Sequence, residues 1–325
     1  QLQDASLASA GPAAAIAPSS ATRVALFLVP PNSSTPSTLL NQLLERCAPP
    51  KRSAESDTSA SAGALPGDSD SAQEFPTSSH SWVPRLGRIL QQDRLRLRLQ
   101  GSVATGTAQQ SHYEILLGVI DDNGRISLPG ELITAAEQHQ RMDIIDRWII
   151  QHTFQWLQAH PEKIHQLGCI HINLSGNALQ SKPFQAFLLT ELERGELPNQ
   201  AIGFEISETT ASANLPRAAD FIARVRSAGC QFALDNFGKG AGSLELLRNL
   251  PVNMVKFDRG YCRDLSTASR SYALLNALAS AARSLGITTC AQGVENEAIL
   301  QNLEALGIDY AQGFGVSKPA LLDEA

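Results

Sequence analysis

From Arg94 onward, short apolar runs alternate with longer segments of helical pattern. Between residues 94 and 99, leucines and arginines alternate, so the two residue types take opposite faces of an extended strand. Residues 113–120 form the next apolar run, and the connection before it is too short for the dozen-residue crossover that a parallel pair of strands needs. The pattern therefore predicts an antiparallel pair over 94–99 and 113–120.

Six more apolar runs follow, separated by segments of helical pattern. Helices are expected first over 130–139 and 144–159. With the first pair, the later runs predict an α/β fold, a (β/α)8 TIM-like barrel whose first strand is antiparallel. An open doubly wound sheet is the alternative, but no glycine-rich dinucleotide fingerprint follows the first strand. The later strands are expected at 169–174, 202–206, 231–235, 252–257, 288–292 and 310–313.

The first part of the chain differs in composition. Ala, Ser, Pro and Gly dominate residues 1–80, and such a segment buries too little apolar surface to offset its chain entropy. We interpret 1–80 as a low-complexity linker and 81–325 as the barrel domain. Within the linker, the apolar run 24–29 and the leucines at helical spacing over 38–47 indicate a remnant of a preceding domain.

Charge and cysteine content narrow the class of protein. A formal net charge of -6 argues against DNA binding, which needs a dense basic surface. The five cysteines are widely spaced and include no C-x-x-C pair, which is typical of the reducing cytoplasm. No apolar stretch approaches the roughly 20 residues of a membrane span. We therefore expect a cytoplasmic protein without a membrane span.

Polar side chains recur at the ends of the predicted strands, where a β/α barrel carries its reactive groups. A single polar residue there is more often a cap or a hydrogen-bonded core group, but an ordered set favours one site. Three carboxylates and an amide oxygen suit a hard cation such as Mg²⁺ or Mn²⁺, and a lysine beside such a cation commonly serves a phosphodiester. The set comprises Glu114, Asn173, Glu205, Asp235, Lys256, Gln292 and Gln312.

Around these positions, the sequence over about 82–319 resembles the EAL family of cyclic-di-GMP phosphodiesterases and receptors. Seven segments match the family's motifs in the family's order. They are 113–117 (YEILL), 173–175 (NLS), 204–208 (FEISE), 235–238 (DNFG), 256–258 (KFD), 291–295 (AQGVE) and 312–313 (QG).

This resemblance implies a barrel that binds cyclic-di-GMP with Mg²⁺ or Mn²⁺. By the resemblance, Lys256 lies near the hydrolytic water and acts with Glu114 and Asp235 in catalysis. Asp146 matches a guanine-contacting position, and Glu208 matches a residue that steadies the loop after Asp235. The implied partners are a PilZ-type or other signalling protein and a second copy of the chain. The implied metal ligands are Glu114, Asn173, Glu205 and Asp235, and the implied nucleotide contacts are Leu116, Asp146, Glu208, Gln292, Glu295 and Gln312.

The sequence departs from active members of the family at several of these positions. Asn236 replaces the aspartate that holds a second metal, and Gln292 replaces a glutamate of the same environment. The loop 237–243 has two positions that are smaller or more flexible than in the family, and Gly118 stands where an arginine normally meets a phosphate. In two-metal hydrolysis the second cation clamps the reacting oxygens, so its loss impairs the chemistry more than the binding.

Three functions remain open from the sequence. The chain is expected to be a degenerate receptor of cyclic-di-GMP, similar to receptors of the FimX type, with one metal site or none. A slow metal-dependent phosphodiesterase giving linear pGpG is the second hypothesis, because the residues expected to bind the first metal survive. A nucleotide-independent interaction module is the third, and Gly118 is its main support.

Overall fold

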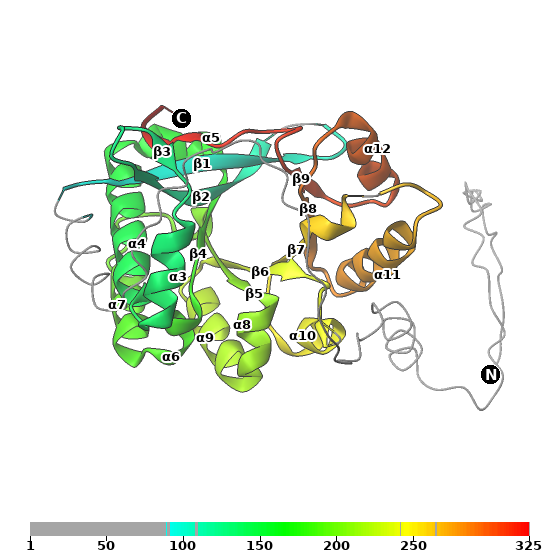
Figure 1. Cartoon of the computed structure of the whole chain (residues 1–325). Helices are drawn as coiled ribbons and strands as arrows, with labels where there is room; N and C mark the ends of the chain where they lie inside the picture. The colour runs from blue at the N-terminus through cyan, green and yellow to red at the C-terminus, as the bar shows by residue number, and fades with distance from the viewer. Residues whose placement is uncertain (1–88, 90–91, 108–109, 241, 264, 325) are drawn as a thin grey trace, which may run out of the picture. The chain divides into compact units, whose positions relative to one another are not determined.

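A computed structural model describes residues 89, 92–107, 110–240, 242–263 and 265–324. The proposed linker over 1–80, with its apolar run and its helical segment, lies outside these residues. Eight strands of the described part close into a ring (Figure 1). They are β1 (Leu95–Ala104), β2 (Gln110–Ile120), β4 (Cys169–Asn173), β5 (Ile202–Ser207), β6 (Gln231–Phe237), β7 (Met254–Phe257), β8 (Thr288–Gln292) and β9 (Tyr310–Gln312).

The strand directions confirm the predicted barrel. β1 runs antiparallel to both of its ring neighbours, pairing Gln100 with Glu114 of β2 and Val103 with Ala311 of β9. From β2 through β4 to β9, every neighbouring pair in the ring is parallel. Short strands continue the sheet beyond the ring, β3 (Ile126–Ser127) on β2 and β10 (Ala320–Leu321) on β1.

Helices surround the ring (Figure 1). Five of them begin at a capping residue whose side-chain oxygen accepts a backbone N–H of the first turn. The caps are Ser181, Ser207, Asn214, Ser269 and Asn296. Each such cap stabilises its helix by about 1 kcal/mol. The helices are α3 (Gly130–Gln138), α4 (Met142–Ala159), α5 (Pro161–Leu167), α6 (Gly176–Gln180), α7 (Lys182–Glu193), α8 (Glu208–Ala213), α9 (Leu215–Ser227), α10 (Ser243–Asn249), α11 (Arg270–Ser284) and α12 (Glu297–Ala305).

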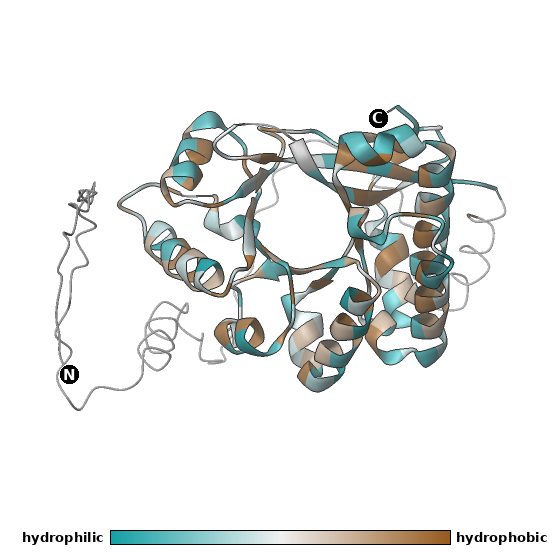
Figure 2. Ribbon diagram, turned by 180° about the vertical axis from the view of Figure 1, so that it is seen from behind, coloured by the Kyte–Doolittle hydropathy of each residue, from teal (hydrophilic) through white to brown (hydrophobic). Residues whose placement is uncertain are grey.

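The core lies between the ring and its helices. Phe204, Phe232 and Phe257 of three successive strands are fully buried, and Phe221 of α9 packs edge-on against Phe232. Apolar and polar residues alternate along the helices, as expected where one helix face packs on the barrel (Figure 2). Across the part of the chain that the structure describes, no helix has the length and apolar character needed to cross a bilayer.

One irregularity in the sheet bears on the site. The register between β6 and β7 shifts between Leu234 and Phe237, and Asn236 has a φ of 53°. Asparagine and aspartate tolerate this left-handed conformation better than most residues. The bulge therefore sets how Asp235 is presented at the end of β6.

Candidate active site

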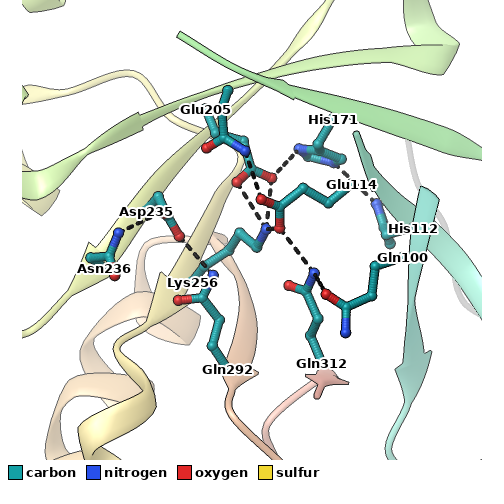
Figure 3. Close-up of polar contacts among 11 residues, drawn as sticks. Gln100, His112, Glu114, His171, Glu205, Asp235, Asn236, Lys256, Gln292 and Gln312 are labelled. Carbon is teal, nitrogen blue, oxygen red and sulfur yellow. Dashed lines mark hydrogen bonds and ion pairs between the residues drawn. The ribbon is translucent and has the colours of Figure 1, made fainter. Parts of the chain in front are cut away.

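Lys256 of β7 lies at the centre of a buried polar network inside the barrel (Figure 3). Its Nζ donates to both carboxylate oxygens of Glu205, at 3.0 and 2.8 Å, and contacts Oε2 of Glu114. Burial alone lowers the pKa of a lysine, but Glu114, Glu205 and Asp235 outweigh it and hold the pKa of Lys256 well above its usual value. Lys256 is therefore a fixed positive charge between two carboxylates.

Glu205 is held ionised by two cationic neighbours. Burial would raise its pKa, yet the nearby Lys256 and His171 lower the pKa to about 2. Nδ1 of His171 lies 3.1 Å from Oε1 of Glu205, within ion-pair distance, although the N–H direction misses the geometry of a hydrogen bond. Burial lowers the pKa of His171, but Cys169 and Glu205 together raise it to about 10.

Glu114 receives its remaining contacts from amides. Nδ2 of Asn173 donates to its Oε1 at 2.6 Å, and Nε2 of Gln312 donates to its Oε2 at 2.9 Å. Gln312 also reaches Oε1 of Gln100 on β1, at 3.4 Å. Side chains of β4 and β9 therefore donate to this carboxylate of β2, and Gln100 of β1 contacts the donor from β9.

Asp235 has a different environment from the other two carboxylates. Nε2 of Gln292 donates to its Oδ1 at 2.8 Å, and Nδ2 of Asn236 donates to its Oδ2 at 2.5 Å. Burial, with smaller contributions from Glu205 and Glu114, raises the pKa of Asp235 to about 7 even though Lys256 opposes the shift. Two neutral amides thus hold this carboxylate.

The four proposed metal ligands gather around the lysine, and their chemistry fits a hard divalent cation. Glu114, Glu205 and Asp235 bring three buried carboxylates to one ammonium, and such a set of oxygen atoms suits a divalent cation. Asn173 presents its N–H to Glu114, so its amide must turn over before the oxygen can serve as a ligand. These residues would hold Mg²⁺ or Mn²⁺ through oxygen atoms.

The proposed guanine contact, Asp146, lies apart from these contacts. It is on α4, is 2% exposed, and accepts hydrogen bonds from the Oγ of Ser175 at 2.6 Å and from its N–H at 3.3 Å. Burial raises the pKa of Asp146 to about 7, against the lowering effect of Ser175. Its contact with a nucleotide stays a prediction, and the ligand would have to reach a side chain that is buried in this structure.

Glu208, the first residue of α8, contacts the loop after Asp235. Its Oε2 accepts the N–H of Lys239 at 2.9 Å and that of Gly240 at 3.3 Å, and its Oε1 accepts the hydroxyl of Ser243. The Nζ of Lys239 forms an ion pair of 2.7 Å with Asp258. The loop is therefore anchored from α8 on one side and from the end of β7 on the other.

The remaining proposed contacts differ in exposure. Leu116 is half-buried on the same face of β2 as Glu114, whereas Glu295 is exposed in the loop after β8. Gly118, on the same face as Leu116, is crowded: a Cβ added there would lie 2.7 Å from Cγ2 of Ile126 and 3.4 Å from Cδ of Arg98. Its φ is not positive, so space rather than backbone freedom favours glycine.

Three residues of the network were not predicted from the sequence: Gln100, His112 and His171 (Figure 3). The signal that could have found them is the two-residue period of a strand. His171 precedes Asn173 by two residues and His112 precedes Glu114 by two, so each shares the inward face of a proposed ligand. Gln100 is the direct cross-strand partner of Glu114.

The sequence matches a known family over most of its length. The EAL domain family model matches residues 84–319. The chain is 34% identical over 253 residues to cyclic di-GMP phosphodiesterase PdeB of Shewanella oneidensis, covering 78% of this chain and 29% of that protein. The chain thus spans less than a third of the length of this relative.

Two solved structures show the same fold. The FimX EAL domain of Pseudomonas aeruginosa, bound to c-di-GMP, superposes with a TM-score of 0.67 at 24% identity, covering 74% of this chain and 96% of that one. The PaMucR phosphodiesterase in complex with c-di-GMP gives a TM-score of 0.70 at 24% identity, covering 75% and 99%. These two likenesses concern the fold alone. The family model matches most of the sequence, and this chain therefore belongs to the EAL domain family.

Proposed function

We propose that this EAL barrel is a receptor that binds cyclic-di-GMP together with one divalent cation and hydrolyses it slowly or not at all. The observation that carries the proposal is the environment of Asp235. Both of its oxygens accept N–H groups from neutral amides, those of Asn236 and Gln292. An aspartate or glutamate at either position would instead present a carboxylate to a second cation.

The rest of the network is suited to holding one cation and a phosphate. Glu114 and Glu205 supply ionised oxygens, and Lys256 supplies a fixed donor for a phosphate oxygen or a water molecule. When bound, Mg²⁺ or Mn²⁺ supplies a Lewis acid that lowers the pKa of its water and polarises a phosphate. Hydrolysis by two cations also needs anionic ligands for the second one, and Asn236 and Gln292 carry no charge.

The relatives support the choice of ligand. PdeB is named a cyclic di-GMP phosphodiesterase, and the FimX EAL domain and PaMucR are both described in complex with c-di-GMP. A slow phosphodiesterase that yields linear pGpG is the second candidate function. The contacts among Lys256, Glu114 and Glu205 favour it, because a lysine fixed between two carboxylates can orient an attacking water beside a single cation.

A receptor acts through a partner. We propose a PilZ-type signalling protein or a second copy of this chain in that role, with the anchored loop 237–243 as the segment that responds to the site. Light scattering of the full chain with and without nucleotide tests for a second copy. A mass that stays that of one chain in both conditions contradicts the dimer.

Calorimetric titration tests the proposed function. Cyclic-di-GMP is titrated into the full chain with Mg²⁺, with Mn²⁺ and with chelator, and the same mixtures are then analysed for linear pGpG. Binding that a divalent cation strengthens, without product, supports the receptor. Rapid formation of pGpG overturns it in favour of the enzyme, and the absence of any binding overturns both in favour of a nucleotide-independent interaction module.

A further inference from the structure

A second group of metal-binding side chains lies inside the barrel, next to the oxygen-rich site. His112 of β2 and Cys169 and His171 of β4 each offer one ligand atom, and these three atoms lie within 4.8 Å of one another. The parallel register pairs His112 with Cys169 and Glu114 with His171. Because side chains alternate along a strand, all three point to the same inward face as Glu114. The group therefore lies toward the amino ends of the strands from Glu114.

The two imidazoles already have the spacing of ligands to one ion. Nδ1 of His112 lies 3.3 Å from Nε2 of His171, and the ring centroids are 5.5 Å apart. Bonds of about 2.0–2.1 Å to a tetrahedral zinc ion place two ligand nitrogens roughly 3.3 Å apart. The same separation also suits a hydrogen bond between the rings, so the thiol of Cys169 is what makes the group a candidate metal site.

The surroundings restrict the position of one imidazole. The other ring nitrogen of His171, Nδ1, faces the carboxylate of Glu205 at 3.1 Å. A histidine that binds a metal typically directs its second ring nitrogen to a carboxylate, which sets the ring orientation. The ring also fills space left by Gly203 of β5, where an added Cβ would lie 2.7 Å from Nδ1 of His171. The position is thus built for a histidine.

The type of ligand selects the type of ion. Two imidazoles and a thiolate suit a borderline-soft cation such as Zn²⁺, whereas Mg²⁺ and Mn²⁺ prefer the oxygen atoms of the neighbouring site. Cys169 is buried, and His112 is half-buried with Tyr310 packed edge-on against its ring. Three protein ligands leave a fourth position for water.

We propose that His112, Cys169 and His171 bind a zinc-class divalent cation at a site separate from the one assigned to Mg²⁺ or Mn²⁺. This proposal does not rest on nucleotide binding. An ion held by His171 would fix the ring that faces Glu205, and it would thereby couple the two sites through one side chain.

Cobalt substitution tests the proposal on the full chain. Co²⁺ is titrated in a large excess of Mg²⁺, which occupies oxygen sites, and absorption is recorded. We expect one equivalent of Co²⁺ to give the visible bands of a tetrahedral ion and a thiolate-to-cobalt charge-transfer band, and one equivalent of Zn²⁺ to remove them. Cys169→Ser should abolish the charge-transfer band, and His112→Ala should weaken Co²⁺ binding at least tenfold while retaining that band.

Two other cysteines provide matched controls. Cys262→Ser removes another buried thiol, and Cys47→Ser removes one outside the described residues; both should leave the spectrum unchanged. A wild-type chain without a charge-transfer band overturns the proposal, whether or not the variants fold. So does a band that survives Cys169→Ser or is lost in either control, because the ion then lies elsewhere. Since no nucleotide is present, failure here is separate from failure of the receptor proposal.

Discussion

At the residue scale, the neutral amides of Asn236 and Gln292 make the site around Asp235 less negative than acids would. The backbone at Asn236 would nevertheless accept an aspartate. Asn236 has a φ of 53°, a conformation that asparagine and aspartate both adopt. Gln292 differs from glutamate by one amide group, and its N–H donates to Asp235. Replacing both residues by acids should therefore preserve the fold while adding two negative charges.

We predict that Asn236→Asp together with Gln292→Glu raises cyclic-di-GMP hydrolysis at least tenfold, because the added carboxylates favour a second cation that clamps the reacting oxygens. Each single change should do less than the pair. The measurement is the rate of pGpG formation with Mn²⁺. Asn249→Asp with Gln301→Glu, which adds the same charges at exposed positions, should change nothing. A wild-type rate typical of an active phosphodiesterase would contradict this prediction.

We predict that Gly118→Arg tightens cyclic-di-GMP binding once space is made for it. The single variant should be destabilised, because its Cβ would lie 2.7 Å from Ile126, a side chain of the short strand β3. Adding Ile126→Ala relieves this contact. A charged hydrogen bond to a phosphate contributes about 1.5–3 kcal/mol, or roughly ten- to hundredfold in affinity.

The matched comparison is between the double variant and Ile126→Ala alone, with affinity measured by calorimetry and stability by thermal melting. Arg98 already packs over Gly118, and its Nη2 donates to the carbonyl of Pro319 at 3.1 Å. A double variant that melts like Ile126→Ala but gains no affinity would show that no phosphate lies within reach of position 118.

We predict that Asp146→Asn stabilises the nucleotide-free protein above neutral pH. The folded pKa of Asp146 is raised from 3.8 to about 7, so the folded state binds more protons than the unfolded state between these values. The stability that wild type draws from this group is therefore lost as pH rises from about 4 to 7. Each pKa unit corresponds to about 1.4 kcal/mol, and we expect a gain of about 1–3 kcal/mol at pH 8.

Urea denaturation of variant and wild type at pH 4.5, 6 and 8 provides the measurement, and the difference in unfolding free energy should grow with pH. Comparing the two chains at each pH cancels the other groups, such as Asp235, that titrate in the same range. Asp323→Asn, at an exposed position, is the control and should give no pH-dependent difference. A variant that is less stable than wild type at every pH would show that the carboxylate is needed by Ser175.

Residue types were easier to predict than their environments. The alternation of strands and helices predicts a barrel, and the carboxyl ends of barrel strands converge. The sequence could therefore place Glu205, Asp235 and Lys256 at one site. The burial of Asp146 against Ser175 could not be predicted, since it depends on how α4 packs on the loop after β4. The same holds for His171, whose partner Glu205 comes from the next strand of the ring.

At the element scale, all eight barrel strands were predicted, and the errors lie at their ends. β1 continues to Ala104, beyond the expected end at residue 99, because its second half pairs with β2 and β9 without an alternating pattern. Helix α4 begins at Met142, two residues before the expected start, and Met142 is buried. Such boundaries are set by tertiary contacts that periodicity does not encode.

The loop after Asp235 is held in place by Glu208 of α8. We predict that Glu208→Ala loosens it, because Lys239, Gly240 and Ser243 all lose an acceptor. The loss of buried hydrogen bonds to a charged group should cost about 1.5–3 kcal/mol of stability.

Hydrogen exchange should show faster exchange at the amides of Lys239 and Gly240, with little change in the barrel strands. Glu245→Ala, at an exposed position of α10, removes a nearby carboxylate as a control and should leave the loop unchanged. Uniformly faster exchange across the barrel would instead mean that Glu208 stabilises the whole fold rather than this loop.

At the scale of the whole molecule, the described ring closes without any residue before Leu95, since β1 pairs with both β2 and β9. Ile89 is the first residue that the structure describes, and its side chain is buried in the core. Its carbonyl accepts the N–H of Arg94 at 3.0 Å. The boundary of the folding unit should therefore fall before Ile89 and after the low-complexity segment.

We predict that a chain beginning at Ser79 folds as well as the full chain, whereas one beginning at Arg94 does not. The first cut removes only residues whose composition offers little core, and the second also removes Ile89, whose burial contributes about 1.5–3 kcal/mol. In a domain of this size, each kcal/mol shifts the melting temperature by about 2–4 °C. Thermal melting should thus separate the two shortened chains by several degrees, with the longer one matching the full chain. If the chain that begins at Ser79 aggregates or melts as low as the one that begins at Arg94, residues 1–78 contribute to the core, and the interpretation of that segment as a linker is wrong.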